Sequence, residues 1–443
     1  MNKTTVVVSC PIDTYSGYGA RARDFVRALD KSKYDVKILS QRWGNTRFGY
    51  LDDHNEFELK SLIIPNLTSQ PDVWVQVTVP NEFQKVGKFS IGLTAGMETD
   101  VCPPEWVKGC NNMDLILVSS NHGKASLVNS KFKMQDDKTG KEIGELAIKV
   151  PVEVLFEGVD IEKYYSIETK QEGTLIETLD QIPESFGYLF VGHWLQGAFG
   201  QDRKNVGWMI KAFLEVFKNK KNAPALILKT QSANASIMDR DQLLSKINEI
   251  RSTVKGTLPN IYLLHGEMSD KEINQLYNHS KVKSMLTFTK GEGFGRPLLE
   301  FSLTGKPIIA SGWSGHLDFL NSEFTVLVGG NLNNVDNSAV QKGIIVKEAK
   351  WFQPNDSEAA FALKSVFENY KKYQELAKRQ RYYAKSNFSF DKMKEKLDEI
   401  LNRCLPSFPK QVELNIPTLN LPKLQKVDNK ELPKLQLPKL QKL

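Results

Sequence analysis

The chain has 443 residues, of which 40% are hydrophobic and 25% are charged, an ordinary composition for a globular protein with two domains. No run approaches about 18 apolar residues, so we expect no membrane-spanning helix. The net charge is only +7, and the segment after residue 404 holds seven lysines against three acidic residues, which is not the charge profile of a dedicated nucleic-acid-binding protein.

The cysteines and the N-terminus indicate a cytoplasmic protein. The chain contains four cysteines: Cys10, Cys102, Cys110 and Cys404. They are too few for a disulfide framework, and no two have the C-x-x-C spacing of redox or zinc sites. Residues 1–10 have only three consecutive valines as an apolar core, which is too short for a signal peptide. We therefore expect a reducing compartment.

The first part of the chain alternates strands and helices, which predicts a Rossmann-like domain over residues 1–165. A β-branched strand over residues 4–10 leads into a loop with Gly17 and Gly19, followed by an amphipathic helix over residues 20–29. A lone G-x-G is weak evidence for phosphate binding, and a simple tight turn is the alternative. Further strands are expected at residues 36–39, 73–77, 90–94 and 114–119.

Glu98 and Asp100 follow the strand expected at residues 90–94, at the edge where α/β folds build their sites. A capping or structural role is the alternative for both. His122 lies at the turn that leads into the next helix, and it has either a role in the site or a structural role in capping or packing. The lysine-rich stretch over residues 131–149 predicts a surface hairpin or a flexible insertion, and a polar linker is expected at residues 161–185.

A second Rossmann-like domain is predicted over residues 186–385, beginning with a strand at residues 187–192. Arg203 and Lys204 lie in the loop before its first helix, and Lys229 and His265 follow the strands at residues 225–228 and 261–264. Asp239, Arg240 and Asp241 have the D-x-D spacing of metal-dependent transferases. They stand at an expected helix start rather than at a strand edge, so we interpret them as a cap and expect no metal site.

Residues 283–311 predict a strand, a glycine-rich loop, a short helix and another strand, which together form a βαβ unit. Gly291, Gly293 and Gly295 lack side chains, so a ligand could approach the backbone closely. Pro297 fits the first helical position. The free N–H groups at such a helix start suit a phosphate or diphosphate.

Two acidic residues bracket this loop, because Glu292 lies within it and Glu300 lies about one turn into the helix. Carboxylates are unsuited to holding phosphates but accept hydrogen bonds from neutral hydroxyls. A tight turn with solvated acids is the alternative. The spacing favours a site for a sugar or ribose joined to a phosphate.

The stretch EGFGRPLLE, with seven residues between Glu292 and Glu300, is followed by TGKPIIAS and resembles the donor-site signature of retaining GT-B glycosyltransferases of the large family four. This resemblance implies two Rossmann-like α/β domains that face a cleft, and a nucleotide-diphosphate sugar as donor, without a metal or a further cofactor. It implies that Glu300 binds the nucleotide ribose and that Glu292 contacts the transferred sugar. The backbone of Gly293, Phe294 and Gly295 would line the sugar and phosphate site.

The same resemblance assigns roles outside this stretch. Lys204, with Arg203, would meet the donor diphosphate and stabilise the leaving phosphate. Glu98 would act on the acceptor side, so that Glu98, Lys204 and Glu292 are the expected catalytic residues. Donor contacts are further implied for Gly17, Gly19, Lys229 and His265. His193 stands where the family often has an arginine, so that contact is open.

Residues 386–404 would form the helix that returns to the first domain in GT-B proteins. From residue 405 to 443 the sequence Leu-Pro-Lys-Leu-Gln recurs, which predicts an extended or disordered tail that is either solvated or docks on a partner, a second subunit or an anionic membrane surface. Other functions remain open: a sugar-nucleotide epimerase, a transferase acting on DNA bases, or a non-catalytic nucleotide-sugar-binding scaffold.

Overall fold

The N-terminal part of the protein is built on a six-stranded parallel sheet. The computed structural model describes residues 3–136, 139–195, 197–232 and 235–408. The strand order is β2-β1-β3-β4-β5-β8, and every neighbouring pair is parallel. The strands are β1 (Thr4–Cys10), β2 (Tyr34–Ser40), β3 (Val73–Val77), β4 (Phe89–Thr94), β5 (Leu115–Val118) and β8 (Val152–Val154). We call this sheet with its helices the N-terminal lobe.

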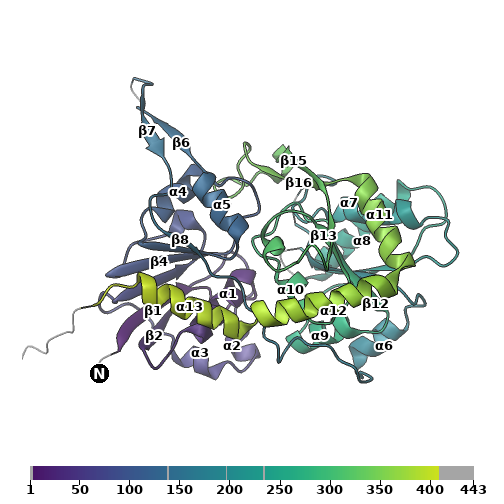
Figure 1. Ribbon diagram of the computed structural model, residues 1–443, viewed down its shortest axis with the longest axis horizontal. Coiled ribbons are helices and arrows are strands. Elements are labelled where there is room, and N and C mark those ends of the chain that lie inside the picture. Colours follow the sequence, from purple (N-terminus) through teal and green to yellow (C-terminus); the bar gives the residue numbers. More distant parts are fainter. Residues whose placement is uncertain (1–2, 137–138, 196, 233–234, 409–443) are drawn as a thin grey trace, which may run out of the picture. The chain divides into compact units, whose positions relative to one another are not determined.

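The helices of this lobe are α1 (Gly17–Ala28), α2 (Tyr50–Asp53), α3 (Phe57–Ser61), α4 (Pro104–Cys110) and α5 (Asn121–Asn129). Helix α1 begins at Gly17, three residues before the predicted start, because the Ser16 hydroxyl accepts a hydrogen bond from the Gly19 N–H and caps the first turn. The predicted hairpin is present as the antiparallel strands β6 (Phe132–Gln135) and β7 (Glu142–Leu146). Figure 1 shows it projecting from the lobe.

A second six-stranded parallel sheet forms what we call the C-terminal lobe, with the order β11-β10-β9-β12-β13-β14. Its strands are β9 (Gly187–His193), β10 (Ala225–Gln231), β11 (Ile261–Leu264), β12 (Val282–Thr287), β13 (Ile308–Ser311) and β14 (Val326–Val328). Its helices are α6 (Thr174–Asp180), α7 (Val206–Phe217), α8 (Ile237–Ser252), α9 (Asp270–Asn278), α10 (Arg296–Ser302) and α11 (Asp356–Glu368). Helix α6 lies within the stretch that was expected to be a polar linker, where Ile176 and Leu179 are buried.

Alternate residues along these strands enter two different hydrophobic cores. Phe190 and Leu228 belong to the core beneath α7 and α11, whereas Leu189 and Ile227 belong to the core beneath α9 and α10. A sheet covered on both faces needs continuous apolar strands, and this sheet has them. Its carboxyl edge is thereby fixed as a rigid platform for the loops that follow the strands.

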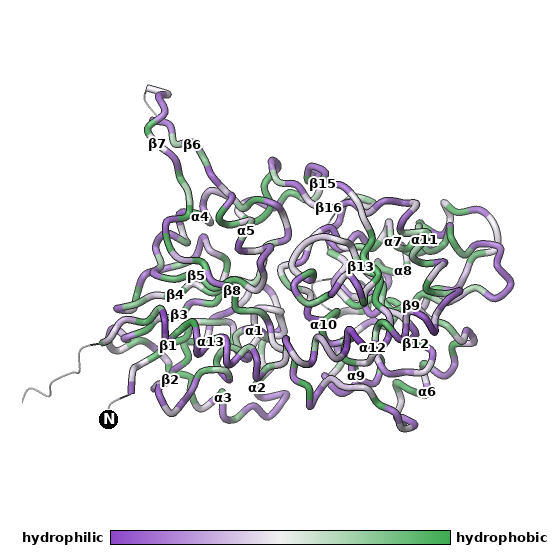
Figure 2. Tube along the Cα trace, viewed as in Figure 1, coloured by the Kyte–Doolittle hydropathy of each residue, from purple (hydrophilic) through white to green (hydrophobic). Residues whose placement is uncertain are grey.

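The described part of the chain ends in two helices, and the second of them packs against α1 of the N-terminal lobe. These are α12 (Tyr370–Asn387) and α13 (Phe390–Cys404), which are separate helices because Phe388 leaves helical geometry with φ −127° and Ser389 caps the second one. Figure 1 shows α13 beside α1, with which it packs. Figure 2 shows α12 as mostly hydrophilic, in keeping with its exposed position.

The prediction for the Leu-Pro-Lys-rich tail falls almost entirely on residues 409–443, outside the described residues. Within the described ranges, no helix is long and apolar enough to cross a membrane.

Candidate functional site

The glycine-rich loop leaves β12 at the carboxyl edge of the C-terminal sheet and enters α10. Gly295 caps this helix in the left-handed region with φ +99°, which a residue with a side chain rarely adopts. A Cβ atom on Gly295 would also lie 3.2 Å from the Cβ of His316. Pro297 is the second residue of α10 rather than the first. Glycine is thus required at the entry to the helix by both conformation and packing.

Gly291 and Gly293 serve the contact between the lobes. A Cβ atom on Gly291 would lie 1.9 Å from the carbonyl oxygen of Glu98, and one on Gly293 would lie 1.9 Å from that of Ala95. The Ser120 hydroxyl also donates to the carbonyl oxygen of Gly293 at 2.7 Å. The close approach that we expected for a ligand is therefore made here by the backbone of the N-terminal lobe.

We predict that Gly293→Ala lowers stability by roughly 1–3 kcal/mol, because the added methyl group must push the two loops apart. The measurement is the thermal unfolding midpoint followed by circular dichroism. Gly17→Ala is the matched control, since nothing lies within 4 Å of a Cβ at that position. Equal midpoints for the two variants would contradict this packing.

The three predicted catalytic residues, with Arg203, lie in one charged cluster. Oε1 of Glu98 lies 3.6 Å from Nε of Arg203, and Nη1 of Arg203 lies 3.4 Å from Oε2 of Glu292. The Lys204 ammonium donates a hydrogen bond to Oε1 of Glu292. Four side chains from three distant segments thus form a chain of alternating charge across the contact between the lobes.

Burial and the neighbouring opposite charges shift the pKa values of the residues in this cluster in opposite directions. Burial opposes ionisation of Glu292, but attraction from Lys204 and Arg203 outweighs it and lowers the pKa of this carboxyl to about 2. Burial disfavours the charged form of Arg203, yet Glu98 and Glu292 raise its pKa. Burial lowers the pKa of Lys204 despite the attraction of Glu292. Glu292 is therefore a carboxylate at any physiological pH.

Little space remains beside the Lys204–Glu292 pair. The cavity bordered by these two residues, Gly295 and Pro297 has a volume of about 10 Å³. That is room for about one water molecule. A diphosphate could reach Lys204 only if Glu292 moved away from it.

Glu300 borders a much larger cavity, of about 500 Å³, between the two lobes. Gly17, at the start of α1, lines the same cavity. The Tyr277 hydroxyl donates to Oε2 of Glu300 at 3.4 Å. Burial raises the pKa of this carboxyl to about 7, against the opposing attraction of Arg296. The structure therefore brings Glu300 and Gly17 to one cavity, with Glu300 poised to change its charge near neutral pH.

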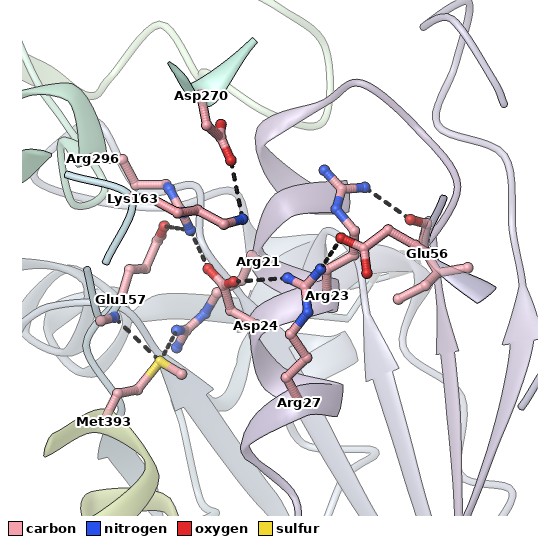
Figure 3. A network of polar contacts seen from close by, with 12 residues as sticks. Arg21, Arg23, Asp24, Arg27, Glu56, Glu157, Lys163, Asp270, Arg296 and Met393 are labelled. Atoms are coloured by element: carbon pink, nitrogen blue, oxygen red, sulfur yellow. Dashed lines mark hydrogen bonds and ion pairs between the residues drawn. The ribbon is translucent and has the colours of Figure 1, made fainter. Parts of the chain in front are cut away.

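Arg296 connects the lobes at the edge of this cavity. Its guanidinium donates to Asp24 of α1 and lies 3.6 Å from Oε2 of Glu157 and 3.6 Å from Oε1 of Glu300. Figure 3 shows Arg296 reaching between Asp24 and Glu157, with the Lys163–Asp270 pair close by. The cation thus holds together three carboxylates, two of them from the opposite lobe.

Gly19 and Phe294 are both enclosed by contacts with other protein groups. The Gly19 N–H is used by the cap of α1, and a Cβ on Gly19 would lie 2.4 Å from the carbonyl oxygen of Thr14. The ring of Phe294 is 3% exposed and packs against Phe319 at 5.0 Å between ring centres. Both residues support the loops structurally.

Two other predicted donor residues are held by neighbouring protein groups. The Lys229 ammonium donates to the carbonyl oxygen of Gly266 at 2.5 Å. Nε2 of His265 lies 2.8 Å from Oδ2 of Asp239, which also accepts from the Ser232 N–H. The His265 side chain is thus engaged in a partly buried pair.

The D-x-D stretch is structural, but its role differs from the one predicted. Ser236, not Asp239, caps α8, and Asp239 is the acid that holds His265. Across the described ranges, no three His, Cys, Asp or Glu side chains gather as a metal ion would require.

Of the remaining residues named from the sequence, Asp100 and His122 make structural contacts, whereas His193 lies near the charged cluster. Asp100 accepts from the Lys350 N–H at 2.6 Å and ties strand β16 (Lys350–Pro354) to the N-terminal lobe. His122 packs edge-on against Trp313, and burial lowers its pKa to about 4. Desolvation lowers the pKa of His193, and the cations Lys204, Arg203 and Lys229 lower it further. His193 is therefore close enough to feel the same positive charge.

Sequence reasoning missed Arg296, Asp24 and His316. Arg296 lies within the recognised stretch, but nothing local distinguishes it from a solvated arginine. His316 is fully buried, its Nε2 lies 2.7 Å from the carbonyl oxygen of Ser311, and its Nδ1 has no partner among the described residues. The only available signal for His316 was its position in a glycine-containing turn over residues 312–318.

The fold resembles solved structures of glycosyltransferases. A glycosyltransferase from Rickettsia africae ESF-5 has a TM-score of 0.62 at 15% identity, covering 92% of this chain and 100% of that chain. Anabaena HepE in complex with UDP has a TM-score of 0.57 at 12% identity, with coverages of 90% and 100%. Sucrose-phosphate synthase from Thermosynechococcus elongatus has a TM-score of 0.59 at 11% identity, with coverages of 91% and 99%.

Identities this low show a shared fold, and the prediction of two Rossmann-like α/β domains in a GT-B arrangement is confirmed. No family model matches the chain, and no curated protein matches it.

Proposed function

We propose that this protein is a glycosyltransferase that moves a sugar from a nucleotide-diphosphate sugar to a hydroxyl acceptor. The observation that carries the proposal is the convergence of Glu98, Arg203, Lys204 and Glu292 beside α10, with Glu300 further along the same helix. Anabaena HepE has been solved with UDP and with UDP-glucose, which makes UDP-glucose the first donor to test.

In the proposed reaction, Glu300 accepts hydrogen bonds from the ribose, and Lys204 with Arg203 binds the diphosphate. The bond between the anomeric carbon and the phosphate oxygen breaks, and these cations stabilise the charge that develops on the leaving phosphate. The acceptor hydroxyl, held near Glu98, forms the new bond to the same carbon through its oxygen, and its proton passes to the departing phosphate oxygen. Retention and independence of a metal are part of the proposal and rest on the resemblance of the EGFGRPLLE stretch.

Because the cavity beside Lys204 is so small, the proposal includes a movement of Glu292. The donor diphosphate replaces Glu292 as the partner of Lys204, and the released carboxylate accepts hydrogen bonds from the hydroxyls of the transferred sugar. The Lys204–Glu292 pair therefore keeps both side chains in place until the donor arrives.

The test is a donor screen with the purified full-length protein, in which nucleotide release from UDP-, GDP-, ADP- and dTDP-sugars is measured with and without a glycan acceptor mixture. We expect one nucleotide class to bind and to be turned over, and Glu300→Ala to abolish binding. Nucleotide release without sugar transfer would favour an epimerase or hydrolase. Failure of every nucleotide-sugar to bind would overturn the proposal.

The raised pKa of Glu300 predicts pH-dependent donor binding. Since only the carboxylate is a full acceptor for ribose hydroxyls, a pKa of about 7 makes the apparent Kd for UDP-glucose about tenfold weaker at pH 6 than at pH 8. The diphosphate diester of UDP-glucose does not titrate in this range, so calorimetry at both values reports on the protein. Glu300→Gln is expected to abolish the pH dependence, and a flat profile in the unmodified protein would remove Glu300 from the site.

A further inference from the structure

A second large cavity lies beside the glycine-rich loop, outside the site described above. Its volume is about 690 Å³, within the range of roughly 300–1,000 Å³ typical of ligand pockets. Its walls are the hairpin of β15 (Gly330–Asn334) and β16 (Lys350–Pro354) with the starts of α7 and α11. Figure 1 shows this hairpin at the top of the C-terminal lobe.

The cavity is joined to the charged cluster through the backbone of Lys290, the residue before Gly291. The Lys290 N–H donates to the carbonyl oxygen of Arg203 at 2.8 Å, and the Phe352 N–H donates to that of Lys290 at 2.9 Å. The cavity wall and the glycine-rich loop are therefore parts of one hydrogen-bonded framework.

Side-chain amides are the most frequent groups in the lining of this cavity: Gln201, Asn331, Asn333, Asn334, Asn337, Gln353 and Asn355. Asn333, Asn334 and Asn337 are exposed and form no side-chain hydrogen bond with any residue that the structure describes. An amide offers two donor hydrogens and an acceptor oxygen. Such a row matches the alternating donors and acceptors of neighbouring hydroxyl groups.

Three aromatic side chains complete the wall, and of these Trp351 is buried whereas Phe199 and Trp208 are accessible. Phe199 is 54% exposed, and Trp208 is half-buried with its Nε1–H donating to Oδ1 of Asp356 at 3.1 Å. An aromatic ring that is fixed at one edge offers an apolar face for contact. The C–H face of a sugar ring is the natural complement of such a surface when hydroxyls are bound by amides nearby.

The charges of the lining favour a neutral ligand. Lys290 is 2% exposed, its ammonium donates to Oε1 of Gln353, and burial lowers its pKa to about 8. Two carboxylates, Asp336 and Asp356, also line the cavity. Because the single cation, Lys290, has a lowered pKa and faces two acidic side chains, the cavity has no excess of positive charge that would attract an anion.

We propose that this cavity binds a neutral oligosaccharide, through hydrogen bonds to the amides of β15 and contact with Phe199 and Trp208. The proposal adds a carbohydrate site on the C-terminal lobe that is separate from the donor cavity. Binding to it does not require the transferase reaction, so the two proposals fail independently.

The experiment is a glycan microarray of neutral and acidic oligosaccharides, probed with the fluorescently labelled full-length protein. We expect binding to at least one class of neutral oligosaccharide, weakened about tenfold by Phe199→Ala or Asn333→Ala through loss of one aromatic or amide contact. Phe361→Ala is the matched control, because this ring is 71% exposed on α11 and lies outside the cavity. Both variant positions are exposed, so folding should be preserved, which thermal melts will check.

Binding of UDP-glucose serves as a second measurement and should be unchanged in both variants. The proposal is overturned if no neutral oligosaccharide binds, if only acidic ones bind, or if the two variants bind like the Phe361→Ala protein. Loss of UDP-glucose binding in either variant would equally contradict a separate site.

Discussion

Replacing Lys204 with alanine is expected to lower kcat by about 10²–10³-fold and to change the KM for the donor little. Lys204 is one of two cations in the charged cluster and the one that donates directly to Glu292. Under the proposed function its charge matters most when the leaving phosphate gains negative charge, whereas Arg203 remains to bind the donor in the ground state. An interaction made mainly in the transition state affects kcat rather than KM.

The control is Lys220→Ala, which removes a lysine paired with Glu368 at the surface of the same lobe. Steady-state kinetics with the donor identified in the screen provides both parameters. If Lys204→Ala raises KM and leaves kcat unchanged, the lysine contributes only uniform binding, and the proposed stabilisation of the leaving phosphate is wrong.

Sequence reasoning located features that depend on neighbouring residues. The alternation of strands and helices predicted both sheets, because apolar strands bounded by glycine are a local pattern. The loop and short helix around Glu292 and Glu300 were predicted because they too depend on a local property. Gly295 adopts a left-handed conformation that its own lack of a side chain permits.

Features that depend on distant residues could not be predicted in this way. The close packing of Gly293 against Ala95 and the pair of His265 with Asp239 arise only when separate loops meet at a sheet edge. The partners of Arg296 are another example, since Asp24 lies 272 positions away in the chain. Residue type indicated that these groups were polar, but their partners are set by tertiary packing.

Replacing Arg296 with alanine is expected to destabilise the protein by roughly 3–5 kcal/mol, because it leaves buried carboxylates without their cation. The side chains of Asp24, Glu157 and Glu300 are only 13%, 6% and 12% exposed, so water cannot fully replace the guanidinium. The measurement is the midpoint of thermal unfolding by calorimetry. Loss of this cation should also raise the pKa of Glu300 further, because Arg296 opposes the effect of burial there.

The matched control for this variant is Arg47→Ala, which breaks an ion pair with Asp53 whose side chains are 56% and 42% exposed. A solvated pair of this kind contributes about 0–1 kcal/mol, so its unfolding midpoint should barely change. Adding Asp24→Asn to Arg296→Ala should restore part of the lost stability, since one of the uncompensated charges is removed. Two outcomes would contradict this role: a double variant that is no more stable than Arg296→Ala, or two arginine variants that unfold at the same midpoint. In either case Arg296 does not hold the lobes together through these carboxylates. Its loss would then also leave donor binding at pH 7 unchanged.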